Sequence, residues 1–109
     1  MNENQIIAAY VRTSTEDWGD LQQQTNLIMR NLVDEETLNA CSFTMYVDYG
    51  YPGTTESRPA YEALLNDMSN GKVAELIIVT MDRLSRSSEA YEEIIHLARE
   101  NGIEIITIL

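Results

Sequence analysis

A chain of 109 residues is long enough for one hydrophobic core and too short for two, so the sequence predicts a single domain over residues 1–109. Its formal net charge of −11 at pH 7 argues against a domain that binds nucleic acid unaided, because such binding depends largely on neutralising phosphates with Lys and Arg. The single cysteine, Cys41, excludes an internal disulfide, and no apolar run is long enough to span a bilayer, so we expect a cytoplasmic protein outside the membrane.

The first strand–helix unit begins with a nearly continuous apolar run, residues 5–11, which predicts a strand covered on both faces. Asp20 then marks the start of a helix, because Gln23 follows it three residues later, as in a capping box. Helical spacing predicts an inner face made of Leu21, Thr25, Ile28 and Leu32.

The second unit begins with a strand predicted over residues 43–47 and continues through a loop rich in turn formers, residues 48–55. Pro59 suits the first turn of the following helix, and the pair Asn70-Gly71 suits its end. The buried stripe of this helix is predicted at Tyr61, Leu64, Leu65 and Met68.

The third unit begins with a strand over residues 76–79, which the polar segment 82–86 follows. Ser87 or Ser88 can cap the next helix, and Asn101-Gly102 ends it before a fourth strand over residues 103–109. The inner face of the helix is predicted at Tyr91, Ile94, Ile95 and Ala98.

Alternating strands and helices predict an α/β fold of three layers, in which helices cover both faces of a mainly parallel sheet of four to five strands. Ligands of such sheets bind outside the carboxyl ends of the strands. Ser14, Asp48 and the pair Asp82-Arg83 all follow predicted strands. We therefore expect these residues, far apart in sequence, to meet at one edge of the sheet.

The placement of arginine indicates an anion site. The chain has only six arginines, and four of them lie at predicted strand ends or in the segment before a helix: Arg12, Arg58, Arg83 and Arg86. The planar guanidinium group matches phosphate oxygens two at a time, and the sequence shows neither a Gly-rich phosphate loop nor an evident cluster of metal ligands. A serine hydroxyl beside these arginines indicates a phosphate that is attacked as well as bound.

Five short motifs follow one another along the chain: Tyr10-x-Arg12-x-Ser14-Thr15, Leu21-x-x-Gln24, Asp48-x-Gly50 with Gly53, Arg58-Pro59, and Asp82-Arg83-Leu84-Ser85-Arg86. In this order and at near-family spacing, they resemble the catalytic domain of the serine site-specific recombinases, the resolvase/invertase family. Any one motif alone is weak evidence, but five in register are specific.

The resemblance implies DNA strand exchange through a covalent protein–DNA intermediate, without a metal or a nucleotide cofactor. Ser14 would be the nucleophile that attacks the scissile phosphodiester, joins the 5′ phosphate and releases a 3′ hydroxyl. The residues implied to support it are the phosphate-contacting Arg12, Arg58, Arg83 and Arg86, the polar Gln24 and Asp82, and the acidic Asp48.

The resemblance also implies partners. Family members act as dimers that pair into tetramers, and they continue into a long dimerisation helix and a DNA-binding domain. We therefore expect residues 1–109 to be the catalytic domain alone, with double-stranded DNA held mostly by regions outside this chain.

Other interpretations stay open from the sequence. The domain could be a non-catalytic assembly domain of recombinase fold, or a receiver-type signalling domain, although the latter should carry paired carboxylates where Arg12 and Ser14 stand. Residue by residue, Asp48 could be an ordinary turn residue, and Arg83 and Arg86 could pair with nearby Glu residues on a helix. His96 lies far in sequence from every motif and is expected to be structural or to face solvent.

Overall fold

The computed structural model describes residues 5–31, 42–51, 58–84 and 88–109, and these build a sheet of four parallel strands. The order across the sheet is β2-β1-β3-β4. The strands are β1 (Ile6–Arg12), β2 (Ser42–Asp48), β3 (Val73–Ile78) and β4 (Glu104–Thr107). This confirms the predicted α/β class and places β1 in the interior of the sheet, paired with β2 on one side and β3 on the other.

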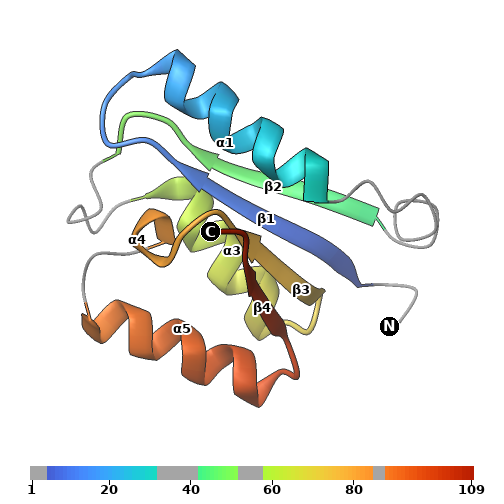
Figure 1. The fold of residues 1–109 in the computed structure, drawn as a ribbon. Coiled ribbons are helices and arrows are strands. Elements are labelled where there is room, and N and C mark those ends of the chain that lie inside the picture. Colours follow the sequence, from blue (N-terminus) through green and yellow to red (C-terminus); the bar gives the residue numbers. More distant parts are fainter. Residues whose placement is uncertain (1–4, 32–41, 52–57, 85–87) are drawn as a thin grey trace.

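Helices cover both faces of the sheet (Figure 1). One face carries α1 (Trp18–Asn31), and the other carries α3 (Pro59–Ser69) and α5 (Ser88–Glu100). The reason is the strand order: the chain moves from β1 to β2 in one direction and from β2 to β3 and β4 in the other. Right-handed crossovers that run in opposite directions place their helices on opposite faces.

Two apolar cores follow from the alternation of side chains along the central strand. Ala8 and Tyr10 point into the core beneath α3 and α5, where Leu64, Met68 and Ile94 are fully buried. Ile7, Ala9 and Val11 point the other way, against Ile28 of α1. Because both faces of β1 are covered, its sequence is nearly continuously apolar.

The ends of α3 and α5 lie where the sequence predicts them, whereas the start of α1 does not. Both α3 and α5 end at an Asn-Gly pair, and Gly71 and Gly102 take the left-handed conformation with φ of 72° and 64°. Asp20 was predicted to cap the start of α1, but the helix begins two residues earlier, at Trp18. The cap is Asp17, whose carboxylate accepts the backbone N–H of Asp20 at 3.0 Å.

Other differences concern element ends and one exposed side chain. The strand predicted over residues 76–79 begins earlier, at Val73, and a short helix that the sequence did not predict, α4 (Met81–Leu84), follows β3. Tyr91 was predicted to face inward, but it is 38% exposed, whereas Ile94 and Ala98 are buried as expected. Leu32 and Ser87 lie outside the described residues. No helix in the described part of the chain has the length and apolar character needed to cross a membrane.

The packing of α1 gives a stability prediction. Ile28 is fully buried against the sheet, and its neighbour Met29 is 42% exposed. Ile28→Ala should lower the free energy of unfolding by about 2–5 kcal/mol, because it leaves a cavity in a closed core. Met29→Ala, the control, should change it by less than about 1 kcal/mol. Urea unfolding followed by circular dichroism measures both, and equal losses would contradict the packing described here.

Candidate active site

The carboxyl ends of β1 and β3 lie where the strand order reverses, which is the ligand-binding position of open α/β sheets. Arg12 is the last residue of β1, and Ser14 follows it by two residues. Asp82 and Arg83 belong to α4, directly after β3. The fold therefore brings these sequence-predicted residues to one edge of the sheet, as expected from the strand–helix order.

Arg12 is completely buried and connects the segments that surround it. Its Nε donates to the carbonyl oxygen of Arg83 at 3.1 Å, its Nη2 to that of Asp82 at 2.9 Å, and its Nη1 to that of Tyr51 at 3.0 Å. Two of these carbonyls follow β3 and the third follows β2. One guanidinium group thus fixes the backbone on both sides of the strand end.

The same guanidinium contacts the candidate nucleophile. Nη1 of Arg12 donates to Oγ of Ser14 at 2.9 Å, and Ser14 is half-buried. Arginine does not accept a proton, but a charged N–H donor stabilises negative charge that develops on the oxygen it contacts. This contact therefore favours the alkoxide character that a serine nucleophile requires.

Arg83 is held by a carboxylate on α1. Its Nη1 and Nη2 donate to the two oxygens of Asp20 at 2.9 and 3.1 Å, and Nη1 also lies 3.4 Å from the carbonyl oxygen of Arg12. Gln24 is buried, and its Nε2 donates both to that carbonyl and to Asp20, each at 3.1 Å. Arg83 therefore has an acidic partner, as one interpretation of the sequence proposed, but the partner is on another helix.

Asp48 acts as a helix cap in this structure. Its Oδ1 accepts the backbone N–H of Ala60 at 2.9 Å, and its Oδ2 accepts that of Tyr61 at 3.0 Å and the hydroxyl of Tyr10 at 2.7 Å. A carboxylate at the first turn of α3 satisfies donors that have no partner within the helix. Asp48 is 2% exposed, so its contacts anchor α3 to the end of β2.

Arg58 lies against this cap on the same face of the sheet. It is 3% exposed, and its Nη1 donates to the hydroxyl of Tyr10 at 3.2 Å and to the carbonyl of Leu84 at 2.7 Å. Its guanidinium carbon lies 4.0 Å from the ring centroid of Tyr61, a cation–π contact. Nε of Arg58 has no hydrogen-bond partner among the described residues, so this buried cation keeps a donor for a further acceptor.

Two predicted site residues remain. Asp82 is exposed; its backbone carbonyl binds Arg12, and its carboxylate accepts the hydroxyl of Thr80. Arg86 lies outside the described residues, so its predicted contact with phosphate remains a prediction. Within the described ranges, no three His, Cys, Asp or Glu side chains are grouped as metal ligands would be.

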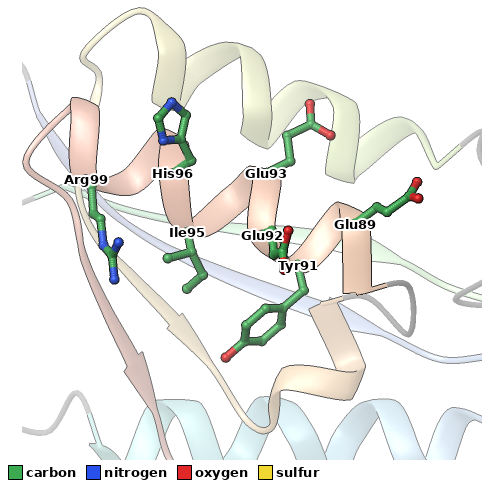
Figure 2. A pocket seen from close by; sticks show the side chains of 7 residues that line it. All are labelled: Glu89, Tyr91, Glu92, Glu93, Ile95, His96 and Arg99. Atoms are coloured by element: carbon green, nitrogen blue, oxygen red, sulfur yellow. The ribbon is translucent and has the colours of Figure 1, made fainter.

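Two hollows differ in chemistry. A cavity of about 290 Å³ lies beside the strand ends, where Asp20, Gln24, Asp82 and Arg83 line it. A larger hollow of about 640 Å³ runs along the outer side of α5, where glutamates outnumber the cationic groups (Figure 2). His96 on that surface is exposed and pairs with Glu100 at 2.7 Å, as expected for a histidine remote from the site.

Sequence reasoning missed two side chains that organise the site. Asp20 was assigned to a helix cap, and its role as the partner of Arg83 depends on a contact between residues 63 positions apart. Thr13 is buried, and its hydroxyl accepts the backbone N–H of Gly50 at 2.9 Å. Thr13 lies between the motif residues Arg12 and Ser14, and no local pattern in the sequence marks this contact.

Comparison with known proteins gives a family match over nearly the whole chain. A family model described as the resolvase N-terminal domain matches residues 7–109. A putative DNA recombinase of Bacillus subtilis (strain 168) is 32% identical over 85 residues, which are 74% of this chain and 16% of that protein. The chain thus spans only a small part of the length of this relative.

Solved structures show the same fold. The N-terminal catalytic domain of TP901-1 integrase superposes with a TM-score of 0.77 at 24% identity, covering 95% of this chain and 78% of that one. The C-terminal catalytic domain of ISC1926 TnpA, an IS607-like serine recombinase, superposes with a TM-score of 0.78 at 21% identity, covering 94% of this chain and 67% of that one. A serine recombinase from Sulfolobus solfataricus superposes with a TM-score of 0.77 at 24% identity, covering 96% of this chain and 69% of that one.

The capping role of Asp48 gives a second prediction. Asp48→Asn replaces one acceptor oxygen by a donor, so at least one N–H or O–H group that it now binds is left unpaired in a buried place. The expected loss is about 1–3 kcal/mol of unfolding free energy, measured by urea unfolding. Glu62→Gln, an exposed carboxylate on the same helix, is the control and should change stability little. Equal stabilities of the two variants would contradict the cap.

Tyr10 gives a pH-dependent prediction. Burial first, and then the hydrogen bond to Asp48, raise the pKa of Tyr10 far above its ordinary value of 10.0. Above pH 10 the unfolded chain loses this proton, whereas the folded protein keeps it. The contribution of Tyr10 to the free energy of unfolding is therefore fully present below pH 10 and is lost as the pH rises above it.

Tyr10→Phe removes this contribution to the pH dependence. The difference in unfolding free energy between the unsubstituted protein and Tyr10→Phe should shrink by about 1.4 kcal/mol per pH unit above pH 10. Urea midpoints at successive pH values measure it. A difference that stays constant up to pH 11 would show that Tyr10 titrates alike in both states.

Proposed function

The chain belongs to the resolvase family of serine recombinases, and on that premise we propose that its site cleaves and rejoins DNA with Ser14 as the nucleophile. The observation that carries this proposal is the 2.9 Å contact between Nη1 of Arg12 and Oγ of Ser14. It joins a hydroxyl to a buried cation at the strand-order reversal of the sheet, where an α/β fold binds its ligand.

The proposed step exchanges one phosphodiester for another. A bond forms between Oγ of Ser14 and phosphorus as the bond from phosphorus to the DNA 3′ oxygen breaks. The serine hydroxyl loses one proton and the 3′ oxygen gains one, so the overall step needs no oxidant, reductant or nucleotide. Because an ester bond is conserved, the reverse attack by a 3′ hydroxyl can rejoin the strand and release the serine.

Arginine supplies the electrostatic part of this chemistry. Charge spreads over the non-bridging oxygens of a phosphate under attack, and guanidinium groups stabilise it. Arg12 contacts the nucleophile, and Arg58 lies nearby on the α3 side with an unused Nε donor among the described residues. Arg83 and Arg86 are proposed to complete the phosphate contacts, with Gln24, Asp48 and Asp82 fixing the surrounding backbone and side chains.

The net charge of −11 supports a recombinase in which this domain carries the catalytic site and other regions bind most of the DNA. A domain this acidic gains little from contact with the DNA backbone, so most of the affinity for double-stranded DNA must come from other regions. We propose that this chain is the catalytic domain of such a recombinase, and that copies of it pair as dimers and tetramers on DNA.

The alternative of a non-catalytic assembly domain has one observation in its favour. Arg83 is paired with Asp20 and is therefore not free to bind a phosphate in this arrangement. The receiver-type alternative has no such support, because Arg12 and Ser14 stand at and just after the end of β1 instead of paired carboxylates.

The test of the proposed function is covalent trapping. The full-length protein is incubated with DNA that carries its crossover site and a nick that prevents religation, and adducts are separated on a denaturing gel. We expect an adduct with the native protein and with Ser69→Ala, which removes an exposed serine on α3, and none with Ser14→Ala. Peptide mass spectrometry should place the phosphate on Ser14. An adduct that persists in Ser14→Ala, or no adduct with the native protein, would overturn the assignment.

A further inference from the structure

The guanidinium of Arg83 is occupied by a carboxylate, whereas the proposed chemistry uses this guanidinium to bind a phosphate. Asp20 accepts from both terminal nitrogens of Arg83, at 2.9 and 3.1 Å, which is the two-pronged geometry that arginine also offers to phosphate. The pair is partly accessible, with side-chain exposures of 29% for Arg83 and 23% for Asp20. Asp20 thus satisfies Arg83 in the way that a DNA phosphate would.

A closed set of hydrogen bonds holds this pair in place. Arg83 and Gln24 both donate to Oδ2 of Asp20, and both also donate to the carbonyl of Arg12. The two donors and the two acceptors form a ring that links α1, the end of β1 and α4. The arrangement therefore gives Arg83 a defined resting position.

The resting position places Arg83 among acidic residues. The cavity that Arg83 lines is also lined by Asp20 and Asp82. Among the described residues that line it, one guanidinium stands against two carboxylates, a balance that does not favour a further anion. A phosphate can use both terminal nitrogens of Arg83 only when Asp20 releases them.

We propose that Asp20 is a positioning residue that holds Arg83 in a resting pose, and that the scissile phosphate competes with Asp20 for this guanidinium. The inference rests on the proposed function, because it takes Arg83 as a phosphate ligand. When a phosphate replaces the Asp20 carboxylate, Arg83 keeps the same number of hydrogen bonds, because both groups accept from its two terminal nitrogens. After release, Asp20 keeps the amide of Gln24 and lies in the first turn of α1, where a negative charge is stabilised.

The direct test measures phosphate binding to the 109-residue chain. Inorganic phosphate is titrated into the protein while the side-chain Nε–H resonance of Arg83 is followed by NMR, with the resonance identified by its loss in Arg83→Lys. Asp20→Asn should bind phosphate about fivefold more tightly at Arg83 than the native protein, because one partly exposed ion pair no longer competes.

Glu92→Gln is the matched control. It removes one negative charge on the outer side of α5, so it reports the effect of net charge alone. Asp20→Ser, which also removes the carboxylate, repeats the test if Asp20→Asn does not fold, and Asp20→Glu should restore competition. Binding in Asp20→Asn or Asp20→Ser that is no tighter than in Glu92→Gln would overturn the proposal.

A second measurement separates this proposal from the proposed function. In the full-length protein, Asp20→Asn should form the Ser14–DNA adduct faster than the native protein at DNA concentrations below saturation. Tighter phosphate binding without any adduct would keep the competition and reject the recombinase chemistry. An adduct in the native protein without a gain in phosphate binding would keep the chemistry and reject the role of Asp20.

Discussion

The buried guanidinium of Arg12 is the constraint on which the geometry of the site depends. A cation removed from water must be surrounded by acceptors, and here the backbone carbonyls of Tyr51, Asp82 and Arg83 act as acceptors together with Oγ of Ser14. These groups belong to three segments that are distant in sequence. A single side chain at the end of β1 therefore connects Tyr51 after β2, α4 and the serine. Loss of its charge would release all of them together.

The few arginines of this acidic chain are concentrated at the candidate site. The described site arginines are buried or partly buried, and each donates to backbone oxygens within the domain. In an acidic chain this placement gathers the guanidinium groups near one edge of the sheet, where Arg83 is also paired with Asp20.

The fold and part of the site could be predicted because their signals are local. The apolar run before Arg12, the Pro59 start and the Asn-Gly helix ends each reflect a backbone preference that depends on neighbouring residues. The cap of α1 was misplaced because Asp17 and Asp20 are chemically alike, and only the structure shows that Asp20 contacts Arg83. That contact spans 63 positions and leaves no periodic signal in the sequence.

Asp48 shows why a motif does not reveal which of its residues react. Its carboxylate caps α3 and accepts from Tyr10, whose hydroxyl in turn accepts from Arg58. Arg58 also binds the carbonyl of Leu84, while Arg12 and Asp20 bind the backbone and side chain of Arg83.

The four residues of α4 are thus held from both faces of the sheet. A helix this short has too few internal hydrogen bonds to be stable alone, so its position depends on these distant partners. Several members of the five motifs therefore hold α4, which carries Arg83, and Ser14 is the member for which we propose chemistry.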